Sequence, residues 1–203
     1  MLARMRCLPI AICLCMLALS CVAPNTGSSV RPDSSFKPDL PVARPPYNEV
    51  HADWKERLPQ AYIYVEHVGS YTETGRLLPG LFAAMKAAGI EPSGPPFGLF
   101  YDDPGEVPAD RLLSRACFPV SLPPGPEAGL KSDQLPTQTV VYTLVSGPYP
   151  GIPQAYPGVL AFVRKMGWAV DGPVREIYIT PPESVTDYAD LLAEIQVPVS
   201  ESR

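Results

Sequence analysis

The chain has 203 residues, of which 46% are hydrophobic, and it carries a formal net charge of −5. This length suits one domain with appendages, and the hydrophobic content suffices for a buried core. Because no run of Lys and Arg marks a basic surface, the composition argues against binding of DNA or RNA. An acidic protein is better suited to neutral or cationic ligands.

Residues 1–20 have the pattern of a secretory signal. Two arginines give a positive start, and an apolar run of about 13 residues then extends to Leu19, which is short for a membrane span. The run ends in Ala18-Leu19-Ser20-Cys21, which resembles a bacterial lipoprotein box, in which the cysteine is lipidated and becomes the new N-terminus. An uncleaved anchor and an ordinary signal cleavage are the alternatives.

Residues 21–50 are predicted to be a tether that starts at the lipidated Cys21. Pro, Ser, Asn and Gly dominate this segment, which has no apolar periodicity, and a Pro-rich tether is extended and semi-rigid. We therefore expect a protein of the cell envelope, bound to the membrane through its N-terminal lipid. The residue after Cys21 is Val22 rather than an Asp. In a diderm host this favours the periplasmic face of the outer membrane.

An internal repeat organises the remaining residues, 51–203. Residues of the same type recur at an offset of 78 positions, as Tyr64 and Tyr142 illustrate. The other matched residues are mostly glycines and prolines: Gly69, Pro79, Gly80, Gly89, Gly94, Pro95 and Pro104 correspond to Gly147, Pro157, Gly158, Gly167, Gly172, Pro173 and Pro182. The two repeat halves are therefore about 61–120 and 139–199.

Each half predicts the order β-α-β-β. Pro79 and Pro157 suit the first turn of a helix, and Gly89 and Gly167 suit its C-terminal cap. Strands are expected over 61–65, 97–101 and 113–120 in the first half, and over 139–143, 174–179 and 191–199 in the second half.

The predicted fold class is α+β. Each unit alone would leave a sheet edge or face uncovered, so we expect the two to pack about a pseudo-two-fold axis. The result is a set of antiparallel sheets with one helix packed per half and a ligand cleft between the halves. Of five cysteines only Cys117 lies in this part of the chain, and its apolar neighbours predict a small buried side chain rather than a disulfide.

Two acids distinguish the second half from the first. Glu176 stands where the first half has Gly98, and Glu194 stands where it has Arg115. Strand alternation predicts that Glu176, Glu194 and Tyr178 share the sheet face opposite the helices. A carboxylate in a partly apolar cleft can attract a cation or accept a proton. The alternative is that both acids are solvated residues on a strand face.

Aromatic residues are candidates for the cleft walls. They are Tyr71, Tyr101, Tyr149, Tyr178 and Trp168, and an aromatic wall beside an acid favours flat cationic ligands. Tyr71 and Tyr149 recur in both halves, so a structural role is an equal alternative for them. The two histidines have no Cys or Asp at metal-binding spacing, so neither a metal nor another cofactor is expected.

Short motifs across 61–199 resemble those of the GyrI-like (gyrase-inhibitor-like) effector-binding family. The motifs are His67-Val68-Gly69-Ser70-Tyr71, Phe100-Tyr101-Asp102-Asp103-Pro104, Ser146-Gly147-Pro148-Tyr149, Gly172-Pro173-Val174-Arg175-Glu176-Ile177-Tyr178 and Leu192-Ala193-Glu194-Ile195-Gln196-Val197-Pro198-Val199. The resemblance implies a duplicated β-α-β-β domain that binds small, often aromatic or cationic compounds between its halves. It associates the acid of Arg-Glu-x-Tyr, here Glu176, with ligand recognition.

The chain departs from the transcription regulators of that family, because a secretory segment precedes the domain where they have DNA-binding helices. Three hypotheses follow. The first is a binding module that sequesters or senses an amphipathic or cationic aromatic compound. The second, implied by family members that hydrolyse cyclopropane-bearing toxins, is a hydrolase in which Glu176 or Glu194 activates water. The third is a structural or partner-binding lipoprotein whose cleft is vestigial. The absence of a nucleophile–base pair favours the first over the second.

Overall fold

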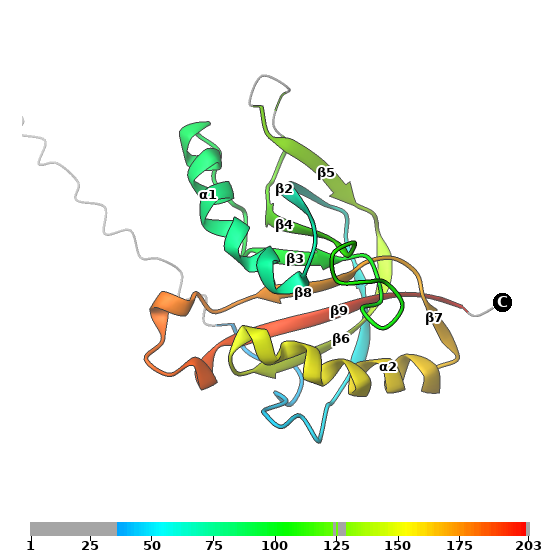
Figure 1. Ribbon diagram of the computed structural model, residues 1–203. Helices are drawn as coiled ribbons and strands as arrows, with labels where there is room; N and C mark the ends of the chain where they lie inside the picture. The colour runs from blue at the N-terminus through cyan, green and yellow to red at the C-terminus, as the bar shows by residue number, and fades with distance from the viewer. Residues whose placement is uncertain (1–35, 124, 126–128, 202–203) are drawn as a thin grey trace, which may run out of the picture. The chain divides into compact units, whose positions relative to one another are not determined.

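The computed structural model describes residues 36–123, 125 and 129–201 (Figure 1), so the predicted signal, Cys21 and most of the tether lie outside the described residues. The described chain combines one curled antiparallel sheet with two α-helices, as predicted. The strands are β1 (Asp53–Arg57), β2 (Gln60–Val68), β3 (Phe97–Phe100), β4 (Leu113–Pro119), β5 (Lys131–Leu135), β6 (Gln138–Ser146), β7 (Trp168–Val170), β8 (Val174–Tyr178) and β9 (Leu192–Glu201), and the helices are α1 (Leu78–Ala87) and α2 (Tyr156–Lys165). The 3-10 segments are η1 (Tyr71–Leu77), η3 (Tyr149–Ala155), η4 (Pro182–Ser184) and η5 (Tyr188–Asp190).

The strand order confirms the duplication. The sheet runs β1-β6-β9-β8-β3-β4-β2-β5, with β7 paired to the C-terminal end of β9. From the centre outward, β8-β9-β6 in one half mirrors β3-β4-β2 in the other. The pseudo-two-fold axis therefore passes between β3 and β8, which are antiparallel, with Gly98 paired to Glu176.

Two further strands, β1 and β5, tie the halves together. Only Leu58 and Pro59 separate β1 from β2, and only Pro136 and Thr137 separate β5 from β6. Yet β1 pairs with β6 and β5 pairs with β2, at opposite ends of the strand order. The three residue steps from the end of one strand to the start of the next reach only about 10 Å, so each link requires the sheet to curl until its two edges lie close together (Figure 1).

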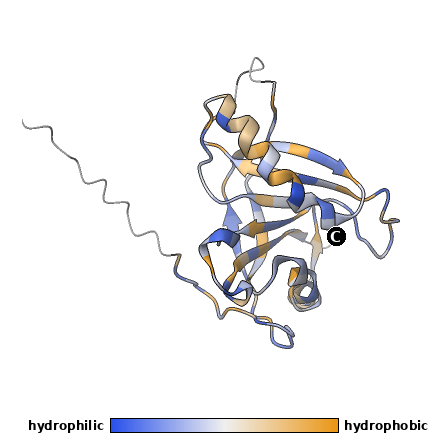
Figure 2. Cartoon of the chain, turned by 60° about the vertical axis from the view of Figure 1, so that its left-hand side comes forward, coloured by the Kyte–Doolittle hydropathy of each residue, from blue (hydrophilic) through white to orange (hydrophobic). Residues whose placement is uncertain are grey.

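Both faces of the curled sheet are buried. On the helix face, α1 places Leu81 and Met85 against Ile63, and α2 places Val159 and Val163 against the apolar residues of β6 and β9. On the opposite face, which we call the inner face, a second cluster forms from Tyr62, Phe97, Leu99, Cys117 and Leu135. Hydrophobic and hydrophilic residues accordingly alternate in short bands along the strands (Figure 2). Cys117 is a buried free thiol, as expected.

The helix ends follow the predicted signals. Pro79 and Pro157 occupy the first turns of α1 and α2, where a missing N–H leaves no hydrogen bond unmade. Gly89 and Gly167 follow the helices with φ of 69° and 71°, a conformation that costs glycine little. No helix in this part of the chain has the length and apolarity needed to cross a membrane.

The last part of the predicted tether packs against the domain. The backbone of Ala43 pairs with β6 through hydrogen bonds of 2.9 Å and 2.8 Å to Leu144 and Ser146. Tyr47 is buried, and its hydroxyl donates to the carbonyl of Ser146 at 3.1 Å. The folded unit thus begins before residue 51, in a segment that has no periodic apolar pattern.

Candidate ligand-binding site

Glu176 is a buried carboxylate at the seam between the two halves. It lies on the helix face of β8, and only 5% of its surface is exposed. The hydroxyl of Tyr156, the first residue of α2, donates to one carboxylate oxygen, and the hydroxyl of Tyr178 donates to the other at 3.1 Å. Within the described residues Glu176 forms no ion pair, so its charge is held by two neutral donors alone.

Burial dominates the electrostatics of Glu176. Loss of water around the carboxylate raises the pKa of Glu176 to about 7, although the hydrogen bonds from Tyr156 and Tyr178 favour the ionised form. Burial raises the pKa of Tyr156 and of Tyr178, and the negative charge of Glu176 raises both further. Near neutral pH the group can therefore take up or release a proton, or hold a negative charge for a cation.

Gly98 makes room for this arrangement. It is the direct partner of Glu176 across β3 and β8. A Cβ atom at Gly98 would lie 2.8 Å from the ring of Phe100 and 3.1 Å from the Tyr178 hydroxyl. The absence of a side chain thus lets an aromatic ring and a phenol hydroxyl approach the backbone beside the carboxylate.

Aromatic rings continue from the carboxylate along the seam. The rings of Tyr149 and Tyr178 have centroids 4.8 Å apart, and those of Tyr71 and Phe100 are 4.9 Å apart. Tyr71 and Tyr149 also play equivalent structural roles in the two halves. The Tyr71 hydroxyl donates to the carbonyl of Asp102, and the Tyr149 hydroxyl donates to the carbonyl of Thr180, 78 positions later.

Sequence comparison identifies the fold family. The profile of the GyrI-like small molecule binding domain matches residues 54–200. The chain belongs to the GyrI-like family. No curated protein sequence matches the chain.

Solved structures agree with this assignment. The EcmrR C-terminal domain is similar with a TM-score of 0.67 and 23% identity, over 75% of this chain and 99% of that one. A hydrolase from Listeria innocua is similar with a TM-score of 0.54 and 13% identity, over 80% and 94% of the two chains. SAV2435 bound to tetraphenylphosphonium gives a TM-score of 0.50 and 13% identity, over 74% and 94%. At these identities the similarity establishes the fold alone.

The GyrI-like domain does not place its two predicted acids together. Glu176 pairs with Ile195, and Glu194 pairs with Ile177, so the acids lie on opposite faces of the sheet. The prediction that Glu176 and Tyr178 face away from the helices was also wrong. Glu176 lies on the helix face, where its carboxylate accepts a hydrogen bond from Tyr156 of α2. Strand alternation is ambiguous here, since both faces of β8 are covered and apolar residues do not mark the helix side.

Glu194 belongs to a different network, on the inner face. Its carboxylate forms an ion pair with Lys55 at 2.6 Å and accepts a hydrogen bond from Gln196 at 2.6 Å. The Lys55 ammonium also lies over the ring of Tyr142, 3.8 Å from its centroid. Glu194 is thus compensated by a cation of its own chain, whereas Glu176 is not.

Two other predicted site residues are distant from Glu176 in the GyrI-like fold. Tyr101 lies with the inner-face cluster, and the guanidinium of Arg115 is 5.3 Å from its ring centroid. Trp168 lies in β7 and meets Trp54 edge to face, with centroids 6.2 Å apart. The structure therefore brings together Glu176, Tyr178 and Tyr149 and adds Tyr156, which was not among the predicted site residues.

Proposed function

We propose that this GyrI-like domain binds a small aromatic cation at Glu176. The observation that carries the proposal is the buried carboxylate that has tyrosine hydroxyls for neighbours and no ion pair within the described residues. An ionised group in such surroundings is costly unless a charge of opposite sign approaches it. A ligand cation supplies that charge, and aromatic faces around it add cation–π attraction.

Tyr156 is the residue that a ligand must displace. It is partly exposed, it stands at the first position of α2, and its hydroxyl occupies one oxygen of Glu176. A cation that replaces this hydroxyl exchanges a hydrogen bond from a neutral donor for a charge–charge contact in a region with little water. We infer that binding favours conformations in which the start of α2 moves away from β8.

The proposal is supported by one similar structure, since SAV2435 was solved with tetraphenylphosphonium, a cation with four aromatic rings. Tetraphenylphosphonium is therefore the probe of choice for calorimetry on the full-length protein in mild detergent. Wild-type protein should bind it about tenfold more tightly at pH 8 than at pH 6, because Glu176 with a pKa of about 7 is ionised at the higher pH.

A matched pair of variants tests the role of Glu176. Glu176→Gln should weaken tetraphenylphosphonium binding about five- to 150-fold, which corresponds to the loss of a charge-assisted contact. Glu194→Gln removes the same charge from the neighbouring strand on the other face, and it should change affinity less than about twofold. Triphenylphosphine oxide, a neutral aryl analogue, should bind wild type and Glu176→Gln alike. Equal affinity of both variants for the cation would refute the proposal.

A hydrolase is the second candidate function. The observation that favours it is the pKa of Glu176 near 7, the range in which a carboxylate can act as a general base at neutral pH. Turnover of a cyclopropane-bearing electrophile that Glu176→Gln abolishes and Glu194→Gln preserves would establish this function in place of binding alone.

We further propose that the domain is tethered in the cell envelope through lipid on Cys21. The support is the sequence pattern of residues 1–21, which lie outside the described residues. Metabolic labelling with a palmitate analogue should mark the wild-type protein and place it in the membrane fraction. Cys21→Ser should lose the label and either lose membrane association or remain unprocessed. Equal labelling and membrane retention of that variant would contradict lipidation at this residue.

A further inference from the structure

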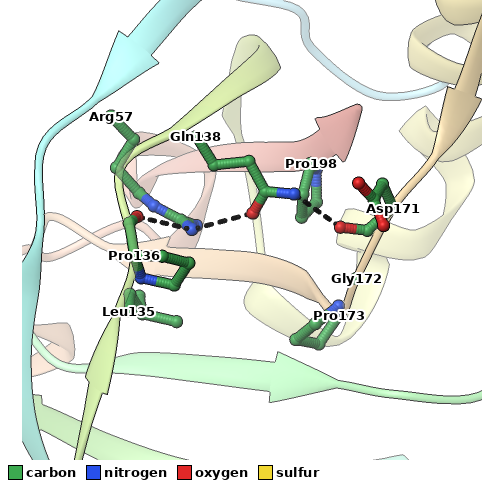
Figure 3. A pocket seen from close by; sticks show the side chains of 8 residues that line it. All are labelled: Arg57, Leu135, Pro136, Gln138, Asp171, Gly172, Pro173 and Pro198. Atoms are coloured by element: carbon green, nitrogen blue, oxygen red, sulfur yellow. Dashed lines mark hydrogen bonds between the residues drawn. The ribbon is translucent and has the colours of Figure 1, made fainter. Parts of the chain in front are cut away.

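A pocket opens where the edges of the curled sheet approach each other, away from Glu176. It has a volume of about 260 Å³, and Figure 3 shows Arg57 and Gln138 reaching into it from β1 and β6. The Gln138 side chain is held in place, since it accepts from Arg57 at 3.2 Å and donates to the carbonyl of Asp171 at 2.6 Å. Apart from Asp171, which is exposed, the remaining lining is mainly apolar and consists of Leu135, Pro136, Gly172, Pro173 and Pro198.

Two buried guanidinium groups serve this end of the inner face. Arg57 and Arg175 are 8% and 5% exposed. Arg175 lies two positions after the pocket residue Pro173, which immediately precedes β8. It lies over the ring of Phe97 at 3.9 Å and donates to Gln60 across the curled sheet at 2.5 Å.

Neither guanidinium has an acidic partner among the described residues. Two partly buried cations of the inner face are compensated, Lys55 by Glu194 at 2.6 Å and Arg115 by Asp133 at 2.9 Å. Arg57 donates only to the Pro136 carbonyl and to Gln138, and its Nε atom is buried without a hydrogen-bond partner. The Nε atom of Arg175 is likewise buried and unpartnered.

The electrostatic consequence is an excess of positive charge in a region poor in water. Burial lowers the pKa of Arg57, and burial together with the charge of Arg57 lowers the pKa of Arg175 to about 10. A lowered pKa is the shift expected for a buried cation that lacks a counter-ion, and both guanidinium groups show it. An anion placed in the pocket beside Arg57 would offset this cost and offer an acceptor to the Arg57 guanidinium.

We propose that this pocket binds a small organic carboxylate. The Arg57 guanidinium receives the carboxylate, and Leu135 and the three prolines contact the apolar body of the ligand. The volume is just below the range of about 300–1,000 Å³ typical of drug-sized ligands, which limits the ligand to roughly one ring or a short chain. The site is distinct from Glu176, which lies on the helix face and prefers the opposite charge.

Benzoate is the probe that tests this site, with benzamide as its neutral isostere and inorganic phosphate as a purely ionic competitor. In amide-resolved NMR of the full-length protein in mild detergent, benzoate should shift the backbone amide of Gly172 and the side-chain amide of Gln138. Benzamide should bind at least about tenfold more weakly, because it lacks the charge that pairs with Arg57. Binding of phosphate without binding of benzoate would overturn the assignment to an organic carboxylate, as would benzoate shifts confined to Tyr156 and its neighbours.

Charge variants of opposite sign complete the test. Arg57→Gln should weaken benzoate binding at least about tenfold, whereas Arg164→Gln, which removes an exposed charge from α2, should change it less than about twofold. Asp171→Asn removes an exposed acid from the pocket rim and should tighten binding about two- to threefold, and it leaves the buried residues intact. Unchanged affinity in both Arg57→Gln and Asp171→Asn would refute the proposal.

Discussion

Replacing Glu176 with Gln should make the protein more stable at alkaline pH while removing a pH dependence of folding. Glutamine has the same shape as glutamate, and its amide can still pair with the hydroxyls of Tyr156 and Tyr178. It cannot ionise. The variant therefore isolates the free-energy cost of holding a negative charge in a site that is 5% exposed.

The sign and size of the effect follow from the pKa. Burial raises the pKa of Glu176 from 4.5 to about 7, so the folded state binds a proton more tightly than the unfolded state does. The contribution of Glu176 to the free energy of unfolding is therefore largest below pH 4.5. It falls as the pH rises from 4.5 through the folded-state pKa of about 7. Each pKa unit corresponds to about 1.4 kcal/mol, so the total loss is about 3 kcal/mol and is complete above pH 8.

Urea unfolding followed by the fluorescence of Trp54 and Trp168 measures this loss. The free energy of unfolding of Glu176→Gln minus that of wild type should increase by about 3 kcal/mol between pH 4.5 and pH 8. Glu183→Gln, at an exposed position, controls for the change in net charge and should show a difference that is nearly independent of pH. A Glu176→Gln difference that stays constant within about 0.5 kcal/mol over this range would show that the carboxylate is solvated and refute the reasoning.

Two further predictions concern the matched glycines Gly80 and Gly158 and the hydroxyl of Tyr156. Gly80→Ala should stabilise the protein by up to about 1 kcal/mol, because a Cβ there meets nothing within 4 Å. Gly158→Ala should destabilise it by about 1–3 kcal/mol, because its Cβ would lie 2.5 Å from Val50. Changes of the same sign in the urea midpoints of the two variants, relative to wild type, would contradict this contrast. Tyr156→Phe removes one donor to the ionised carboxylate, so the pKa of Glu176 should rise above 7 when titrated by carbon-detected NMR, and a lower value would contradict the hydrogen bond.

The internal repeat predicts most of the fold because its signals are local. Prolines at the first turn of each helix and glycines after it act through their own backbone conformations. Their effect can therefore be predicted from the sequence without knowledge of distant neighbours. The strands β1 and β5 also lie 78 positions apart, as Asp53 and Lys131 show, but they share no identical residue. Their role depends on pairing with the opposite half, and no local pattern encodes a partner strand that is distant in sequence.

The candidate site was found by the divergence of the halves and misplaced by strand alternation. Glu176 stood out because its counterpart is Gly98, which is a comparison that needs no structure. Alternation assigns faces only when one face is solvated, and here Arg175 is buried on the inner face while Glu176 is buried on the helix face. Tyr156 has helical spacing typical of a core residue, so its hydroxyl contact required the position of α2 over β8.

The pseudo-symmetry itself explains why only one half carries the acid. Strands β3 and β8 meet at the axis, and Gly98 and Glu176 are direct cross-strand partners. A duplicated glutamate at Gly98 would place the Cβ atoms of two glutamates about 5 Å apart on the same buried face, where like charges oppose joint ionisation. It would also displace the ring of Phe100 and the hydroxyl of Tyr178 from their positions beside the backbone. A symmetric fold with its site on the axis therefore requires an asymmetric pair, with an acid from one half and the space for its aromatic partners from the other.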